Sequence, residues 1–398
     1  MKQDNFDIVI IGGSFAGMTS ALGLANISPD IKIAIIEKID IKNQDRKNDG
    51  RSYAISSSSL QFFQEIDIYD ELQQDAGKIR DIKISDGNSP LILDFFGATI
   101  NKKTKQLGQI IESYQIHNAL RNKILKQKNI TIFCPNYYKE INLENGAKIT
   151  LDDNKIINAK LLLACDGRSS QLRHKFQIHT ITKKYHQTAI VFDICHKNNH
   201  NNVAFEKFYP QGPLAILPLK EQNKSSIVWI VPESNIEAYL SLDNENFISQ
   251  LNKKIADDVG IVSKISSKFT YPLTLVEANK FYHKKMLLVG DSACGIHPIA
   301  GQGFNLAISS IEILKNLIKD NFLNGFDISS SNLITEYNKK ARFNSCKMVV
   351  ATDILNSLFE SKSLILSKSR RIGLAITNKI PYLKKIFITA AGGRFDKN

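Results

Sequence analysis

Apolar and polar positions near the start of the chain follow the pattern of a βαβ unit. Residues 7–11 are apolar almost throughout, which is typical of a strand buried on both faces. A glycine-rich turn follows, and residues 17–26 have the spacing of a helix. A second apolar run, residues 32–36, ends at Glu37. This order predicts two parallel strands joined by a helix, as in a nucleotide-binding sheet.

The middle of the chain has a different pattern, in which strand-like runs follow one another with only turn residues between them. One segment, residues 79–96, folds back on itself around Asp86-Gly87, and four further runs cover residues 185–195, 203–208, 214–219 and 225–231. Strands joined in this way predict an antiparallel sheet. From Ser330 onward the spacing is helical.

These patterns predict an α/β protein with a Rossmann-like domain, an inserted and mainly antiparallel β domain, and a helical C-terminal region. A chain of 398 residues with 43% hydrophobic content is long enough for two joined units. We expect the nucleotide-binding domain in three parts, residues 1–78, 105–180 and 271–329. The substrate domain would take residues 79–104 and 181–270, and the helical region residues 330–398.

Charge and cysteine content limit the partners. The net charge of +13 and the pI of 9.3 suit an anionic partner, but lysines are scattered and no basic run is interleaved with aromatic residues, so we expect no nucleic acid. Contact with a membrane surface stays open. The five cysteines form no Cys-x-x-Cys pair, which argues against zinc and a disulfide framework and favours the cytoplasm, with no metal site. No apolar stretch reaches the roughly 18 residues that span a bilayer, and residues 6–11 are too short for a signal segment.

The first chemical motif is the turn after residue 11. It consists of Gly12, Gly13, Ser14, Phe15, Ala16 and Gly17, with Ser14 where the dinucleotide fingerprint has its middle glycine. Glu37 follows Gly17 by 20 residues, where a carboxylate can accept both ribose hydroxyls of an adenosine. The combination predicts a dinucleotide site, and Ser14 offers a phosphate an extra hydroxyl donor.

Three other segments have the pattern of a cofactor site. Residues 290–305 form a strand end, a turn and a helix start, and the Gly-Gln-Gly step allows close approach to a flat or anionic group. Asp166-Gly167 ends a buried strand, and by physics alone it is equally well a simple turn. Arg51 follows a polar loop, where a lone arginine is more often solvated.

Together these segments resemble the aromatic-ring flavin monooxygenases, which carry the same three signatures in the same order. The matching residues are the turn from Gly12 to Gly17, then Asp166, Gly167, Ser170 and Arg173, then Gly290 and Asp291 with Pro298, Gly301, Gln302 and Gly303. Residues 297–303 and 212–219, and the tail pattern at 352–353, 358–359 and 371–374, resemble the ubiquinone-biosynthesis hydroxylases within that group. The similarity covers almost the whole chain.

The resemblance implies FAD as cofactor and NAD(P)H as co-substrate. The site residues it implies are Gly12, Gly13, Ser14, Ala16 and Gly17 at the pyrophosphate, Glu37 at the ribose, Arg51 near the pyrophosphate, Asp166 and Gly167 bracing the cofactor, Gly290 and Asp291 at the ribityl chain or pyrophosphate, and Pro298, Gly301, Gln302, Gly303 and Asn305 at the flavin ring. No catalytic acid or base is singled out. His297 and Pro298 are candidates beside the flavin, although a structural role for His297 fits better.

The implied reaction is hydroxylation of a polyprenylated phenol by dioxygen through a flavin hydroperoxide. The ring pocket is expected between the inserted sheet and the flavin loop, with residues 208–219 and Trp229 in or behind it. Basic and apolar residues in 364–388 suit an interfacial helix, although a docked core helix with a solvated face is the more common case for such a pattern. We expect the protein in the cytoplasm, with contact to the inner face of the membrane and to other quinone-biosynthesis enzymes left open.

Two alternatives stay open, a non-catalytic scaffold for quinone-biosynthesis enzymes and another FAD-dependent oxidoreductase such as a reductase or halogenase. The Trp-x-Trp-x-x-Ile motif of halogenases is absent, since Trp229 is the only tryptophan. Three positions depart from the family pattern: Cys294, Ser310 and Ser113. The ring position, the choice between NADH and NADPH, and the oligomeric state are not legible in the sequence.

Overall fold

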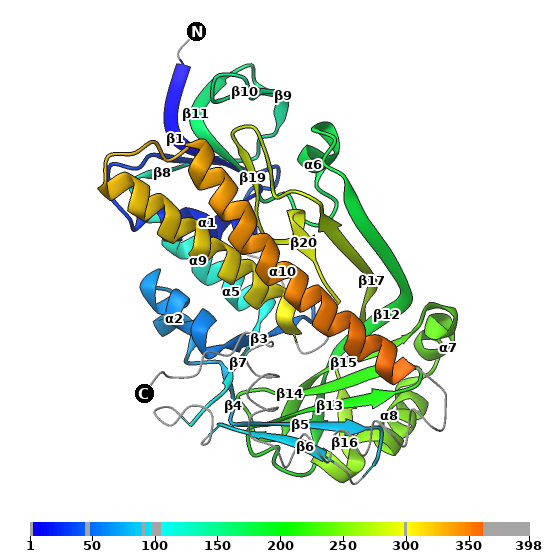
Figure 1. Cartoon of the computed structure of the whole chain (residues 1–398). Helices are drawn as coiled ribbons and strands as arrows, with labels where there is room; N and C mark the ends of the chain where they lie inside the picture. The colour runs from blue at the N-terminus through cyan, green and yellow to red at the C-terminus, as the bar shows by residue number, and fades with distance from the viewer. Residues whose placement is uncertain (1–2, 44–47, 90–91, 98–104, 298–300, 361–398) are drawn as a thin grey trace.

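Two large β-sheets lie at opposite ends of the molecule, and a small sheet and a group of helices connect them (Figure 1). The computed structural model describes residues 3–43, 48–89, 92–97, 105–297 and 301–360, with the backbone alone for residues 354–360. The combination of helices with two sheets confirms the predicted α/β class.

The first sheet has the strand order β18-β19-β11-β1-β2-β8, and β19, β11, β1, β2 and β8 run parallel. The antiparallel strands β9 and β10 extend it beside β11. Its strands are β1 (Gln3–Ile11), β2 (Ile33–Ile36), β8 (Ile130–Phe133), β9 (Tyr138–Asn142), β10 (Ala147–Leu151), β11 (Ile156–Ala164), β18 (Tyr282–His283) and β19 (Met286–Leu288). The apolar run of β1 is buried at every position from Ile8 to Ile11, as expected for a strand covered on both faces.

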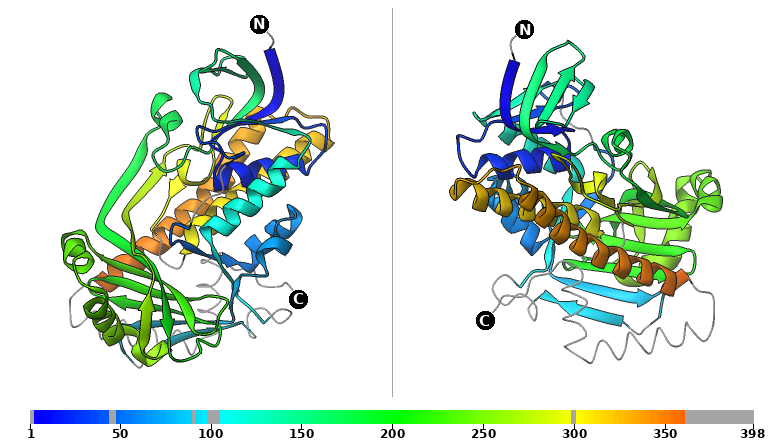
Figure 2. Two further views of the ribbon diagram at one scale, coloured as in Figure 1. Left: turned by 180° about the vertical axis from the view of Figure 1, so that it is seen from behind. Right: turned by 45° about the horizontal axis from the view of Figure 1, so that its top comes forward.

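Helices pack on this sheet and join it to the rest of the molecule. The helix α1 (Phe15–Ala25) contacts both α5 (Ser113–Leu125) and α9 (Gln302–Leu323), and its residues from Gly17 to Ala25 are buried. The helix α10 (Ser331–Glu360) runs along α9 and ends near the second sheet, as both views in Figure 2 show. The shorter helices are α2 (Ser57–Glu65), α3 (Tyr69–Leu72), α6 (Gln171–Lys175), α7 (Ile236–Leu240) and the 3-10 turns Glu233–Asn235 and Gly290–Ser292.

The second sheet has the order β20-β17-β12-β15-β14-β13-β5-β6, with β16 beside β12. All its neighbours are antiparallel except β13 and β5. Its strands are β5 (Asp81–Asp86), β6 (Ile92–Phe96), β12 (Thr180–His196), β13 (Val203–Tyr209), β14 (Gly212–Pro218), β15 (Lys224–Pro232), β16 (Val262–Ile265), β17 (Phe269–Ala278) and β20 (Cys294–Gly295). The five antiparallel segments predicted from the sequence are therefore confirmed, including the hairpin of β5 and β6.

One face of the second sheet is covered by α8 (Asn244–Val259). The helix buries Phe247, Leu251, Ile255 and Val259 against alternate residues of β12, β14 and β15, in a core separate from that of the first sheet. The spacing of these four residues is that of one helical face. The opposite face of the second sheet is turned toward the small sheet described next.

The small sheet consists of β3 (Ser52–Ser56), β7 (Gly108–Glu112) and β4 (Gly77–Ile79), in the order β3-β7-β4. Ile79 and Ile110 of this sheet pack with Ala204 of β13 and contact Leu217 of β14.

The second sheet continues past residue 270, because β17 pairs with β12 as far as Ala278. The division of the chain into domains stays a prediction.

No helix within the described residues is both long and apolar enough to cross a membrane. The predicted interfacial segment, residues 364–388, lies outside the described residues, as does the tail pattern from residue 371 onward.

Candidate functional site

Four of the predicted segments follow strands that are neighbours in the first sheet. The turn at Gly12 follows β1, Glu37 follows β2, Asp166 comes just after β11, and Gly290 comes just after β19. Since these strands are parallel, their carboxyl ends lie at one edge of the sheet. Ligands of open α/β sheets bind at this edge.

The glycines of the first turn are required by the close approach of backbone. A Cβ on Gly12 would lie 2.5 Å from the carbonyl oxygen of Cys165, and Gly12 has a φ of +104°. A Cβ on Gly17 would lie 1.8 Å from the carbonyl oxygen of Gly12. The turn is therefore folded tightly against β11, and α1 begins directly behind it with Ser14 as its N-cap.

Glu37 is bound to the same turn. Its Oε2 accepts a hydrogen bond from the backbone N–H of Gly13 at 2.6 Å, and its Oε1 accepts one from the N–H of Ile39 at 2.9 Å. The residue is 9% exposed. The two bonds hold the carboxylate beside the glycine turn, as the spacing predicted.

Asp166 has one oxygen bound and one without a partner. Its Oδ2 accepts from the N–H of Leu172 at 3.1 Å at the start of α6, whereas the buried Oδ1 has no partner among the described residues. Gly167 has a φ of +80° and open space where a Cβ would be. A buried carboxylate oxygen without a donor is costly, so this oxygen suits a ligand that brings one.

The turn at Gly290 lies against the start of α1. Gly290 has a φ of +68°, and a Cβ there would lie 2.9 Å from the Cβ of Ala16. Asp291 accepts a hydrogen bond from Arg168 at 3.2 Å, and Arg168 also donates to the carbonyl oxygen of Thr274 at 3.0 Å. The arginine thus connects the second and third signature motifs with the second sheet.

Ser170 and Arg173 have structural roles in this arrangement. The Ser170 hydroxyl accepts from the N–H of Arg173 at 3.0 Å and caps α6. The buried guanidinium of Arg173 donates to the carbonyl oxygens of Ser292 at 2.8 Å and Arg168 at 2.7 Å. Burial lowers the pKa of Arg173, while the negative charge of Asp166 acts in the opposite direction.

The loop before α9 leads to the small sheet. Gly301 is the N-cap of α9 in the left-handed conformation, and a Cβ there would lie 3.1 Å from that of Ala54. Asn305 donates to the carbonyl oxygen of Ala54 at 2.8 Å and accepts from the N–H of Ser56 at 3.0 Å. Gln302 is buried and Gly303 lies in the first turn of α9, whereas Pro298 lies outside the described residues.

Arg51 is held by a neighbouring carboxylate. Its Nε donates to Oδ2 of Asp49 at 3.0 Å, and its guanidinium lies 5.3 Å from the centre of the Tyr271 ring. The other oxygen of Asp49 accepts from the hydroxyl of Ser113 at 2.6 Å. Ser113, one of the departures from the family pattern, therefore acts on Arg51 through Asp49.

His297 is fully buried and has a neutral side chain. Its Nε2 lies 3.1 Å from Oε1 of Gln187, and its ring meets that of Tyr185 edge-on at 4.7 Å. Burial, reinforced by the positive charges of Arg168 and Lys183 and opposed by Asp353, lowers the pKa of His297 to about 4. These contacts fit the structural role better than that of a proton donor at neutral pH.

Ser310 and Cys294, the other two departures from the family pattern, are also buried. The Ser310 hydroxyl donates to the carbonyl oxygen of Ala307 at 2.7 Å, one turn back in α9. Cys294 is 5% exposed, and burial together with the nearby Glu277 raises its pKa, so it is the small buried residue predicted and not a thiolate.

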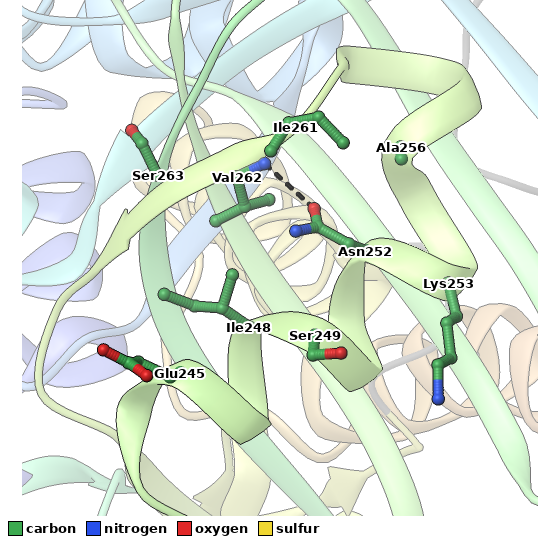
Figure 3. Close-up of a pocket in the computed structure, with 9 residues that line it drawn as sticks. All are labelled: Glu245, Ile248, Ser249, Asn252, Lys253, Ala256, Ile261, Val262 and Ser263. Carbon is green, nitrogen blue, oxygen red and sulfur yellow. Dashed lines mark hydrogen bonds between the residues drawn. The ribbon is translucent and has the colours of Figure 1, made fainter.

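Trp229 lies on the face of the second sheet that α8 covers, and not on the face toward the small sheet. Its ring centre is 4.7 Å from that of Tyr239 and 5.7 Å from that of Phe247, on the side of α7 and α8. An open groove is present between α8 and β16, and none of the predicted site residues lines it (Figure 3). There Oδ1 of Asn252 accepts from the N–H of Val262 at 2.9 Å.

The sequence did not single out Asp49 or Arg168 as site residues. The bond from Ser113 to Asp49 and the bond from Arg168 to Asp291 join residues far apart in the chain, which no local pattern reveals.

Comparisons with known proteins agree with this geometry. Residues 5–349 match the family model described as "FAD binding domain". The chain is 31% identical over 389 residues to a ubiquinone hydroxylase (UbiL) of Rhodospirillum rubrum, covering 97% of this chain and 89% of the relative. It is 29% identical to a ubiquinone hydroxylase (UbiM) of Neisseria meningitidis, covering 96% of this chain and 83% of the relative.

A solved structure gives the same fold. The p-nitrophenol 4-monooxygenase PnpA of Pseudomonas putida superposes with a TM-score of 0.77 at 14% identity, covering 99% of this chain and 100% of that one. The identity is low, so this likeness concerns the arrangement of the elements alone.

Proposed function

This chain belongs to the FAD-binding family of ubiquinone-biosynthesis hydroxylases, and we propose that it hydroxylates the aromatic ring of a polyprenylated phenol with NAD(P)H and dioxygen. One observation carries the proposal. The glycine turn, Glu37, Asp166 and the turn at Gly290 meet at one edge of a parallel sheet, in a chain whose relatives are named for hydroxylation in quinone synthesis.

The residues at this edge fit FAD. The turn from Gly12 to Gly17 carries no side chain at Gly12, Gly13 and Gly17, and the first N–H groups of α1 favour negative charge there. The carboxylate of Glu37 has lone pairs left for the ribose hydroxyls, and the unpartnered oxygen of Asp166 can accept from the cofactor or from the nicotinamide nucleotide.

The flavin ring would lie at the start of α9, beside Gly301, Gln302 and Gly303. The positive end of the α9 dipole would stabilise negative charge on the reduced ring. FAD, when bound, takes a hydride from NAD(P)H and activates dioxygen for transfer of one oxygen atom to the substrate.

The work of the protein is then to position groups and exclude water. Arg168 fixes Asp291 relative to β17, and Asn305 fixes the start of α9 relative to β3, so the two edges of the flavin site are held from opposite sides. The inward face of the second sheet would cover the substrate ring and keep water from the reacting atoms.

A polyprenylated substrate also bears on where the protein acts. We include in the proposal that it works in the cytoplasm at the membrane surface and contacts other enzymes of quinone synthesis. The net charge of +13 supports contact with an anionic surface. Deletion of the residues after Ser367 tests this part, because it should abolish binding to liposomes of anionic lipid.

The experiment that tests the function is expression of this chain in a strain that lacks a quinone-ring hydroxylase, with mass spectrometry of the accumulated lipid. The proposal predicts a lipid with one more oxygen on the ring than in the strain with an empty vector. A Glu37→Ala variant is the matched control and should restore less. No restored hydroxylation at any ring carbon would contradict the proposal and favour the scaffold.

A further inference from the structure

Glu206 is a buried carboxyl group without a partner in the part of the chain that the structure describes. It lies in the middle of β13 and is 8% exposed. Burial alone raises its pKa to about 8, so the carboxylate, the form that can accept a proton, predominates only above that pH. A buried acid whose pKa is raised by burial is a candidate functional group where the geometry places it beside a site.

The alternation of β13 fixes the face on which Glu206 lies. Its neighbour Lys207 points to α8, where the ammonium group donates to Asp258 at 2.6 Å and to the carbonyl oxygen of Lys254 at 2.8 Å. Tyr209 lies on the same side and donates to Lys254. Since successive side chains of a strand point to opposite faces, Glu206 lies on the face away from α8.

That face is turned toward the small sheet, whose strand β3 contacts α9. Ala204, two residues before Glu206, packs with Ile79 and Ile110 of the small sheet in a cluster that Ala54 also contacts. Ala54 in turn accepts the hydrogen bond from Asn305. A short series of contacts therefore leads from the proposed flavin loop to the strand face that carries Glu206.

The neighbours of Glu206 in the sheet are apolar. It is paired with Ala215 of β14 and Ile84 of β5, and Ala215 is paired in turn with Val228 of β15. Ala215, its partner on β14, has a small side chain. A single acid in an apolar surrounding distinguishes a ligand with one polar group from a purely apolar one.

We propose that the Glu206 carboxylate binds the phenolic hydroxyl of the ring that is hydroxylated and accepts its proton. This inference rests on the proposed function and specifies its substrate-binding residue. The phenolic O–H bond breaks and an O–H bond forms on Glu206, while the electron pair stays on the phenolic oxygen. That oxygen then raises the electron density of the ring carbons ortho and para to it.

The proton returns at the end of the cycle. When the ring carbon that has gained oxygen loses its hydrogen to solvent, the protonated Glu206 gives its proton back to the ring oxygen. The ring is aromatic again, and Glu206 is a carboxylate as at the start. The only oxidant is the dioxygen that the proposed reaction already uses.

The test compares 2-geranylphenol with its methyl ether in the FAD-loaded protein at about pH 9, where Glu206 is mainly a carboxylate. The binding of each compound is followed by the change in flavin absorbance, and hydroxylation of the phenol by mass spectrometry. One variant is Glu206→Gln, which keeps the shape of the side chain and can accept a hydrogen bond but cannot take up a proton. The other is Glu206→Leu, which can neither accept a hydrogen bond nor take up a proton. Tyr209→Phe is the matched control, since it removes one polar group from the opposite face of the same strand.

We expect the wild type to bind the phenol at least about tenfold more tightly than the ether, and the Leu variant to bind both equally. The Gln variant should bind the phenol within severalfold of the wild type, yet hydroxylate it about 100-fold or more slowly. The control should behave as the wild type.

Two outcomes would overturn the inference in distinguishable ways. If the wild type hydroxylates the phenol and both Glu206 variants keep its rate and its preference over the ether, Glu206 does not bind the hydroxyl and only this inference fails. If the wild type, reconstituted with FAD, hydroxylates no phenol at all, the proposed function fails and this inference with it.

Discussion

The backbone N–H of Gly13 donates to the carboxylate of Glu37 at 2.6 Å, across the carboxyl ends of β1 and β2. The bond orients a carboxylate beside the turn that would hold a pyrophosphate, before any cofactor binds. A Cβ on Gly13 would lie 2.8 Å from the Cβ of Glu37, so the contact depends on glycine. Preorganisation of this kind lowers the entropy lost on binding.

Replacing Glu37 by Gln should weaken FAD binding about 10- to 100-fold, because one oxygen and the negative charge are lost. Titration of the apoprotein with FAD, followed by quenching of flavin fluorescence, measures the Kd. Asp7→Asn is a matched control, since Asp7 also accepts a backbone N–H, that of Lys32 at 2.9 Å, but at the other end of the same strands. A Kd for the Glu37 variant within twofold of the control would contradict the proposed ribose contact.

Gly17 and Gly303 should respond differently to replacement by Ala. At Gly17 the new Cβ would lie 1.8 Å from the Gly12 oxygen, so the free energy of unfolding should fall by about 3 kcal/mol or more. At Gly303 the nearest atom is 3.9 Å away, in Ile296, so stability should stay within about 1 kcal/mol of the wild type. Urea unfolding measures both.

FAD titration of the Gly303→Ala variant then separates fold from cofactor binding. If the flavin approaches the backbone at Gly303, the well-folded variant should bind FAD at least severalfold more weakly. Wild-type affinity would show that no close approach occurs there.

Arg173 should contribute to stability and not directly to chemistry. Arg173→Ala removes two hydrogen bonds from a buried guanidinium and should lower the free energy of unfolding by about 2–4 kcal/mol. Lys175→Ala, at an exposed position of the same helix, should change it by less than about 0.5 kcal/mol. Equal effects of the two changes in urea unfolding would contradict the assigned role.

His297 should make the protein less stable as the pH falls from 6.5 to 4. In the unfolded chain the imidazole binds a proton below its ordinary pKa of about 6.5, whereas in the folded protein it does so only near 4. The unfolded state therefore holds more protons in this window, which costs at most about 1.4 kcal/mol of folded stability per pH unit.

Thermal unfolding over this pH range measures the effect. His297→Gln should flatten the dependence of Tm on pH, while His174→Gln, at an exposed site, should leave it as in the wild type. An unchanged slope in the His297 variant would mean that other groups carry the dependence.

Much of the fold follows from local sequence pattern. The strand β1 with the turn at Gly12, and the hairpin of β5 and β6, were predictable because buried strands and turns leave signals within a few residues. The residue at which the second sheet ends was not predictable, because the pairing of Val276 in β17 with Thr182 in β12 joins residues far apart in the chain. Pairing of that kind depends on tertiary contacts.

The site divides in the same way. Spacing alone predicted that Glu37 would lie beside the glycine turn, because both end strands of one βαβ unit. It could not predict that Ser113 supports Arg51 through Asp49, or that Arg168 reaches Asp291, since each bond crosses between distant elements. Glu206 stood in a legible alternating strand, but its lack of a partner is visible only in three dimensions.

The central claim is that this chain transfers an oxygen atom from dioxygen to a phenolic ring. The most direct measurement is turnover of the purified, FAD-loaded protein with NAD(P)H and 2-geranylphenol under isotopically labelled dioxygen, with mass spectrometry of the product. The account predicts one labelled oxygen in each hydroxylated ring. Oxidation of NAD(P)H with no hydroxylated product, or a product whose new oxygen comes from water, would contradict it.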